Sequence, residues 1–208
     1  MTWTELLYLL HVSNYVEDID SRREAIAEWL PCVRTMFDYD QKNSYHQYDL
    51  WQHVIHTVLE IDKQIDDDML YLAALLHDIG KPFCRCKGKN DNDVNFHYYG
   101  HPMKSEQIVR EEVVPHLLSK GVILDSKDIN RLLYYVLYHD DRISLREKHL
   151  KRHLKMVDVE TFKKLMVLQV ADAKAHVVCP IIQQRIDICN EWKNGRADDV
   201  LILIKETI

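Results

Sequence analysis

Residues 70–76, Leu-Tyr-Leu-Ala-Ala-Leu-Leu, form an almost continuous apolar run. A helix that is apolar on all sides is stable only where other elements cover it, so this run predicts a helix in the middle of a bundle. His77 and Asp78 follow the run directly, and Gly80 and Pro82 come next. Gly80 suits the left-handed residue that ends a helix, and Pro82 would prevent the helix from continuing.

The rest of the chain also favours helices. Apolar residues recur at a spacing near 3.6, and the 208 residues include only five glycines and five prolines. Sandwiches and barrels need turn residues about every 8 to 12 positions, so this scarcity argues against them. We predict an all-α fold, with a break at Pro31 and a short hairpin near 95–98 inside a long connection at 80–101. The helices are expected at 21–37, 48–64, 69–79, 102–119, 126–139, 158–177, 180–194 and 198–206.

Charge and hydropathy limit the possible partners. The net charge of -6 argues against a surface that binds nucleic acid over its whole extent, and we expect no DNA partner. Two segments, 81–89 and 142–155, are locally basic and are either solvated surface or a rim that attracts phosphate. No apolar run reaches the roughly 18 residues of a membrane span, and the first residues lack a basic leader, so we expect a cytoplasmic protein without a membrane partner.

Two aspartates interrupt apolar helices. Asp78 follows the run at 70–76, and Asp172 lies in the apolar stretch 162–173 with no basic neighbour within a turn except Lys174. A buried carboxylate is costly unless it is paired, hydrogen-bonded or bound to a metal. For His77 and Asp78 the alternative is a satisfied core histidine beside a capping aspartate.

Three further histidines lie beside apolar segments, one in a polar helical stripe, one at the end of an apolar run and one at the start of a helix. His53 belongs to a polar helical stripe that faces either water or a polar cavity, His139 ends the apolar run 132–138, and His101 precedes Pro102 at the expected start of a helix. None of these segments offers a cysteine. Nitrogen and oxygen ligands suit an open site for Mn, Fe, Co, Ni, Zn or Mg rather than a closed structural zinc site.

Other polar clusters are interpreted as surface. His149 and His153 have the i, i+4 spacing that can hold a metal, but the basic side chains around them would repel a cation, which favours a solvated basic face. Asp66, Asp67 and Asp68 are expected to form a surface turn before a helix.

The order of these residues resembles the H…HD…H…H…D pattern of the HD-domain metal-dependent phosphohydrolases, including the His-Asp-Ile-Gly-Lys segment at 77–81. Residues 43–53, 73–82 and 96–101 are similar to the HD region of bacterial CCA-adding tRNA nucleotidyltransferases and poly(A) polymerases. The chain departs from those enzymes because it lacks the Gly-Ser loop and paired aspartates of a nucleotidyltransferase head. The resemblance implies a free-standing, single-domain helical bundle of the HD type over 1–208. Its HD-like core spans about 42–176, with N-terminal helices in 1–40 and C-terminal helices in 177–208 packed on it.

The resemblance also implies roles for individual residues. The primary metal ligands would be His53, His77, Asp78 and Asp172. A second metal or the substrate phosphate would be held by His101 and His139, and the catalytic residues would be Asp78 and Lys81. His46 would be a supporting residue, while His56, His97 and His176 would lie behind the ligands or on the surface.

The implied reaction is hydrolysis of a phosphomonoester or a (cyclic) phosphodiester on a nucleotide or RNA end. A bound divalent metal would lower the pKa of its water and so supply hydroxide at neutral pH, while the metal and Lys81 would neutralise charge on the phosphate. Other HD enzymes cleave deoxynucleotides or alarmones, which the sequence leaves open. A different class of function is a non-catalytic module that binds RNA or a partner and keeps a structural metal.

Overall fold

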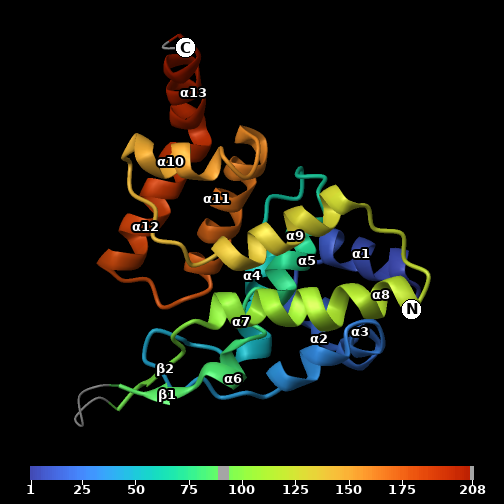
Figure 1. Cartoon of the computed structure of the whole chain (residues 1–208). Helices are drawn as coiled ribbons and strands as arrows, with labels where there is room; N and C mark the ends of the chain where they lie inside the picture. Colours follow the sequence, from blue (N-terminus) through green and yellow to red (C-terminus); the bar gives the residue numbers. More distant parts are fainter. Residues whose placement is uncertain (89–93, 207–208) are drawn as a thin grey trace.

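The apolar run forms the central helix of the fold, α5 (Asp68–Leu76), in a computed structural model of the chain (Figure 1). Every residue from Leu70 to Leu76 is fully buried. Helices α1 (Trp3–Val12), α4 (Leu50–Leu59), α9 (Ser126–Tyr138) and α11 (Val159–Lys174) pack around α5, which explains how a helix without a polar face is stable here. The structure describes residues 1–88 and 94–206, with side chains as far as Ile202. Residues 89–93, which include Lys89 of the first basic segment, and residues 207–208 lie outside the described part.

The prediction of an all-α fold is confirmed, because the described elements are helices and one small antiparallel ribbon. In the ribbon, β1 (Cys86–Lys87) pairs with β2 (Phe96–His97). The helices and helical turns are α1 (Trp3–Val12), α2 (Val16–Asp20), α3 (Arg23–Trp29), η1 (Pro31–Met36), α4 (Leu50–Leu59), α5 (Asp68–Leu76), α6 (Lys81–Cys84), α7 (His101–Ile108), η2 (Val109–Val113), α8 (Val114–Ser119), α9 (Ser126–Tyr138), α10 (Glu147–His153), α11 (Val159–Lys174), α12 (Pro180–Glu191), η3 (Trp192–Arg196) and α13 (Ala197–Glu206).

Several local predictions can be compared with these bounds. The break at Pro31 is confirmed, since α3 ends at Trp29 and a tighter helical turn begins at Pro31. The short hairpin in the long connection is confirmed by β2. Helix α10 was not expected, because its seven residues carry few apolar side chains.

The prediction that Gly80 takes a left-handed conformation is wrong, because its φ is -77°. Glycine is needed there for a different reason. A Cβ on residue 80 would lie 2.6 Å from the carbonyl oxygen of His101 and 2.6 Å from the amide nitrogen of Ser105. The absence of a side chain at Gly80 therefore lets the N-terminal end of α7 approach the segment that follows α5.

Buried apolar side chains from Leu6 in α1 to Val200 in α13 form one contiguous core. Figure 1 shows α13 at the end of the molecule opposite the β1–β2 ribbon. Among residues 1–88 and 94–206, no helix combines the length and apolar character needed to cross a lipid bilayer.

The expectation of a surface turn at residues 66–68 is wrong for Asp67. Its side chain is fully buried, caps α5 through the amides of Met69 and Leu70, and pairs with Lys164 at 2.7 Å. The buried pairing depends on a lysine about a hundred positions away, which local sequence does not reveal.

Candidate metal centre

Six side chains converge beside the C-terminal end of α5. Five of them are buried, and His101 is partly buried. Their positions follow from helix ends, because His77 and His139 cap the C-termini of α5 and α9 and His101 is the first residue of α7. The six are His53 on α4, His77 and Asp78 after α5, His101 on α7, His139 after α9, and Asp172 on α11.

Four of these residues, His53, His77, Asp78 and Asp172, offer ligand atoms that all lie within 4.8 Å of one another. His53 Nε2 is 3.2 Å from Asp78 Oδ2 and 3.2 Å from Asp172 Oδ1. His77 Nε2 is 3.3 Å from Asp78 Oδ2 and 3.6 Å from Asp172 Oδ1. His53 therefore faces the other polar groups inside the fold, and the alternative of an exposed His53 is wrong, since it is 1% exposed.

A second group shares Asp78 with the first. Its ligand atoms, from Asp78, His101 and His139, also lie within 4.8 Å of one another. Asp78 Oδ1 is 3.1 Å from His101 Nε2 and 3.4 Å from His139 Nε2, while Asp78 Oδ2 faces the first group. Asp78 thus presents one carboxylate oxygen to each group, as a carboxylate that bridges two cations would.

Backbone contacts determine which nitrogen each histidine directs inward. The Nδ1 atoms of His77, His101 and His139 lie 2.7 to 2.9 Å from carbonyl oxygens three residues earlier. A carbonyl can only accept a hydrogen bond, so Nδ1 carries the proton in each neutral ring and Nε2 keeps its lone pair. The Nε2 atoms of His101 and His139 are 3.1 Å apart. Two lone pairs at that distance repel each other unless a positive charge lies nearby.

The polar atoms in the two groups are not satisfied by the protein. Both nitrogens of His53, Nε2 of His77 and both oxygens of Asp78 find no hydrogen-bond partner among the described residues. The short nitrogen–oxygen distances above are ion-pair distances without hydrogen-bond geometry. Buried groups left in this state are rare and costly, and cations bound at the two groups would satisfy His53 Nε2, His77 Nε2 and the two Asp78 oxygens. The residues present therefore fit a metal.

The charge balance of the site agrees with this. Burial by itself would raise the pKa of Asp78, but Lys81 and His77 lower it well below its usual range. For Asp172, burial is likewise outweighed, here by His176, His53 and His77. Burial would lower the pKa of His77, yet Asp78 and Asp172 raise it to about 10. The two carboxylates thus stay ionised and draw positive charge to this position, either as a proton on His77 or as a metal cation.

A cavity of about 360 Å³ opens onto this centre, within the roughly 300–1,000 Å³ of small-molecule sites. Lys81 lies in its wall, where Nζ is 2.6 Å from Asp78 Oδ2 and donates to Gln41 Oε1 at 3.0 Å. Arg142 of the second basic segment also lines it. A larger cavity of about 830 Å³ lies between α9 and α11, but its described lining contains no histidine and mixes acidic with basic side chains.

Sequence reasoning missed Arg185, which lies on α12 and lines the smaller cavity. Its Nη1 donates to Asp140 at 3.1 Å, its Nη2 donates to the carbonyl oxygen of His139, and Nη2 is 3.6 Å from Asp172 Oδ2. Arg185 therefore holds Asp172 with Oδ1 directed at the histidines. Nothing in the sequence separates Arg185 from an ordinary surface arginine, because the contact depends on how α12 packs on α11.

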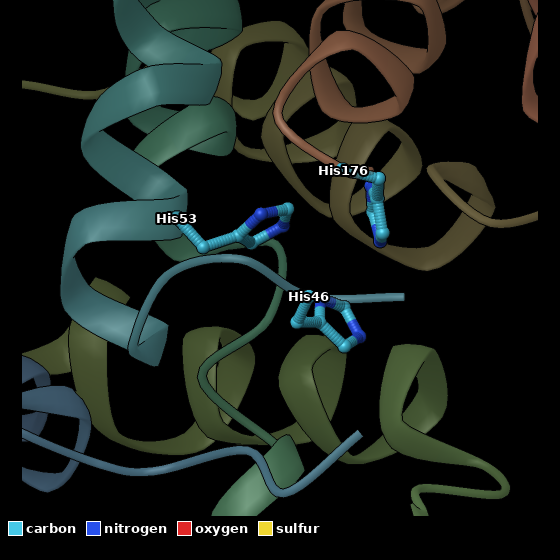
Figure 2. A group of neighbouring side chains, drawn as sticks. All are labelled: His46, His53 and His176. Carbon is cyan, nitrogen blue, oxygen red and sulfur yellow. The ribbon is translucent and has the colours of Figure 1, made fainter. Parts of the chain in front are cut away.

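His46 and His176 form a third group with His53 (Figure 2). The ring centroids are 4.5 to 5.5 Å apart, and His176 Nδ1 lies 2.8 Å from the carbonyl oxygen of Asp172. Burial lowers the pKa of both rings, and it brings that of His176 to about 4. His53 already belongs to the first group, so we place His46 and His176 in the wall of the site rather than among the ligands.

The interpretation of residues 149–153 as a solvated basic face is wrong for His153. Its ring is fully buried, with Nδ1 at 2.8 Å from the Tyr134 hydroxyl and Nε2 at 3.1 Å from Asp141. His149 stays partly exposed. His153 is therefore a satisfied structural histidine.

Comparison with known families gives one match. A family model described as the HD domain matches residues 45–175, which is more than half of the chain and includes all six converging side chains. None of the curated proteins matches the chain. The similarity to CCA-adding enzymes thus stays a prediction from motifs.

Proposed function

The chain belongs to the HD domain family, and on that premise we propose that it is a metal-dependent phosphohydrolase. Members of this family are generally metal-dependent hydrolases, and the buried histidine and aspartate cluster fits a metal site. One observation carries the proposal. In the centre, four histidines and two ionised carboxylates converge, and both nitrogens of His53, Nε2 of His77 and both oxygens of Asp78 lack hydrogen-bond partners among the described residues.

In the proposed assignment, the primary metal is held by His53, His77, Asp78 and Asp172. His101 and His139 hold a second metal, or the phosphate of the substrate. The metal is one of Mn, Fe, Co, Ni, Zn and Mg, to which imidazole and carboxylate ligands are suited. The separate directions of the two Asp78 oxygens support two adjacent positions.

A divalent metal bound there supplies Lewis acidity and lowers the pKa of water close to neutrality. The residues of the chain do the rest. Asp78 orients the water that attacks phosphorus, because its carboxylate lies between the two groups and lines the cavity. Lys81 Nζ donates to a non-bridging oxygen and offsets the negative charge that grows there during the attack. Arg185 keeps Asp172 in place for metal binding.

For the substrate, we propose a phosphomonoester or a (cyclic) phosphodiester of a nucleotide or RNA end, in the cytoplasm. The motif likeness to tRNA-processing enzymes supports this choice. The cavity supports it through charge, because Lys81, Arg142 and Arg185 line it together with the acidic Asp78, Asp140 and Asp172. These six formal charges cancel, so each bound divalent metal would leave an excess of positive charge that suits a phosphate dianion.

The test is a panel of phosphate esters assayed with Mn²⁺, Co²⁺, Ni²⁺ and Mg²⁺, with metal content measured in the same samples. His77→Ala should fold but lose metal and turnover. His56→Ala is the matched control, because His56 lies on the surface side of α4, stacked on Tyr48 with ring centroids 3.9 Å apart. Full turnover by His77→Ala would refute the assignment. RNA binding that weakens steeply with salt, without turnover of any ester, would favour the non-catalytic module instead.

A further inference from the structure

Two aromatic rings stand at the rim of the catalytic cavity. His97 and Tyr99 both line it, together with Asp78, Lys81 and His101. Their rings are almost parallel, with an interplanar angle of 3° and centroids 5.3 Å apart, which is an offset stack. The Tyr99 residue is 64% exposed, so its ring contacts His97 while much of its surface faces solvent.

The backbone fixes this arrangement. Strand β2 ends at His97, and Tyr99 follows in the turn that leads to Gly100 and α7. The stacked rings place His97 and Tyr99 on the same side of this segment, whereas Tyr98 is buried. Tyr98 is 7% exposed, and its hydroxyl donates to the carbonyl oxygen of Gln41. Its own carbonyl oxygen accepts from the amide of His101 at 3.1 Å. Tyr99 thus lies between two anchored residues, the buried Tyr98 and His101 of the proposed metal site, and its own ring faces outward.

The position of Tyr99 matters more than its exposure. Single exposed aromatics are ordinary, and Tyr8 on α1 is 67% exposed without lying on this cavity. Tyr99 differs because it is stacked on His97 and lines a polar cavity. In the proposed function, the metal centre and Lys81 bind the phosphate group. An exposed aromatic ring beside them would add affinity only for a substrate that carries a planar group near its phosphate, because such a group can stack on the ring.

Resting on the proposed function, we infer that Tyr99, supported by His97, is the stacking platform for the nucleobase of the substrate. The phosphate lies over the metal centre and the base lies on the exposed face of Tyr99. Aromatic side chains stack on any base, because every base has a π face. The site should therefore discriminate strongly between substrates with and without a base and only weakly among the four bases.

Equilibrium binding separates this inference from catalysis. The probes are a phosphonate analogue of adenosine monophosphate and methylphosphonate, which lacks the nucleoside, each titrated into the Mn²⁺-loaded protein by calorimetry. Tyr99→Ala should weaken binding of the adenosine probe about five- to 150-fold and leave methylphosphonate binding unchanged. Tyr99→Trp should restore the affinity, whereas Tyr99→Leu, which has bulk but no π face, should not. Tyr8→Ala, with a tyrosine of matched exposure, should change neither constant.

The outcomes are distinct. Equal changes for both probes, no change for either, or failure of the adenosine probe to bind the wild type would overturn the inference. Turnover of methyl phosphate by the wild type reports the proposed function independently. If methyl phosphate is hydrolysed but Tyr99→Ala weakens binding of both probes equally, the proposed hydrolase activity is supported and the stacking role of Tyr99 is refuted. If Tyr99→Ala weakens binding of the adenosine probe alone and no ester is hydrolysed, the stacking role is supported and the hydrolase activity is refuted. Comparing the affinity for a short RNA that has a terminal phosphate with the affinity for the mononucleotide shows whether the stacked base belongs to an RNA end or to a free nucleotide.

Discussion

The two ends of helix α5 carry two buried aspartates with opposite surroundings. At the N-terminus, Asp67 accepts from the amides of Met69 and Leu70, and its Oδ2 lies 2.7 Å from Lys164 Nζ and 3.3 Å from the Tyr135 hydroxyl. Its negative charge also lies at the helix end that favours anions. The protein thus supplies hydrogen-bond and ion-pair partners to both oxygens of Asp67.

At the C-terminus, Asp78 is as deeply buried, at 1% exposure, but neither of its oxygens has a hydrogen bond within residues 1–88 and 94–206. The negative charge lies near the end of α5 that favours cations. Lys81 and four histidines come close without completing its hydrogen bonds. Burial of a carboxylate therefore does not by itself indicate function. What separates the two aspartates is whether the protein supplies their partners.

The strongest test of this contrast is Asp78→Asn. The amide cannot present a charged oxygen to each ligand group, so metal binding and turnover should be lost together, with kcat/KM falling by about 10³-fold or more. Metal content and steady-state rates on the best ester of the panel measure this. Turnover near that of the wild type would place the chemistry elsewhere.

The second test is Asp67→Ala at the other end of α5. Asp67 Oδ2 also pairs with Arg131 Nη1 at 3.4 Å. The substitution removes the helix cap and leaves Arg131 and Lys164 without their shared carboxylate, which should lower the free energy of unfolding by about 3 kcal/mol. Chemical denaturation measures the change. Below the unfolding transition, metal content per folded molecule should equal that of the wild type. A variant that loses metal while still folded would contradict the separation of the two ends.

Metal linkage is the third test. At about 100 times its dissociation constant, Mn²⁺ should raise the free energy of unfolding of the wild type by about 2.7 kcal/mol, because it binds only the folded state. Asp67→Ala should gain the same increment, and Asp78→Asn should gain almost none. Removal of the metal with a chelator should reverse the gain. Equal stabilisation of Asp78→Asn would mean that the ion binds at another site.

The smallest effect is expected at Asp158, and it shows how much of the destabilisation by Asp67→Ala is due to the loss of a helix cap alone. Asp158 caps α11 through the Thr161 amide at 2.7 Å, and this hydrogen bond lowers its pKa below the usual 3.8. The folded pKa lies below the unfolded one, so the cap stabilises above about pH 4 and its contribution is lost as the pH falls through the folded value. Asp158→Ala should cost about 1 kcal/mol at pH 7 and progressively less as the pH falls below about 4, measured by denaturation over this pH range. If Asp158→Ala lowers the free energy of unfolding at pH 7 as much as Asp67→Ala does, capping alone would explain the Asp67 effect and its buried ion pairs would contribute nothing.

Much of the site could be predicted because its residues occupy helix ends. His77 and His139 each close an apolar run, and Asp172 interrupts one, so each was marked by a local conflict between polarity and burial. Their convergence is observed, while their role as ligands remains a proposal. The division into a core at 42–176 and flanking helices likewise remains a prediction.

Other features had no such local mark. Asp67 and His153 were interpreted as surface groups because their sequence neighbours are polar, yet tertiary contacts bury both. Arg185 belongs to a helix with an ordinary mixture of polar and apolar residues. Tyr99 lies in a loop whose sequence does not indicate which tyrosine of the Tyr98–Tyr99 pair is buried.

The sequence by itself determined that the chain is helical, that α5 is central, and that His77 and Asp78 lie at its buried end. These properties depend on periodicity and polarity, which are read over a few helical turns. Only the tertiary structure decided which buried charges are satisfied, where Arg185 reaches, and which aromatic ring faces the cavity. Those outcomes depend on side chains that are distant in the chain and meet only when the helices pack, so no local pattern encodes them.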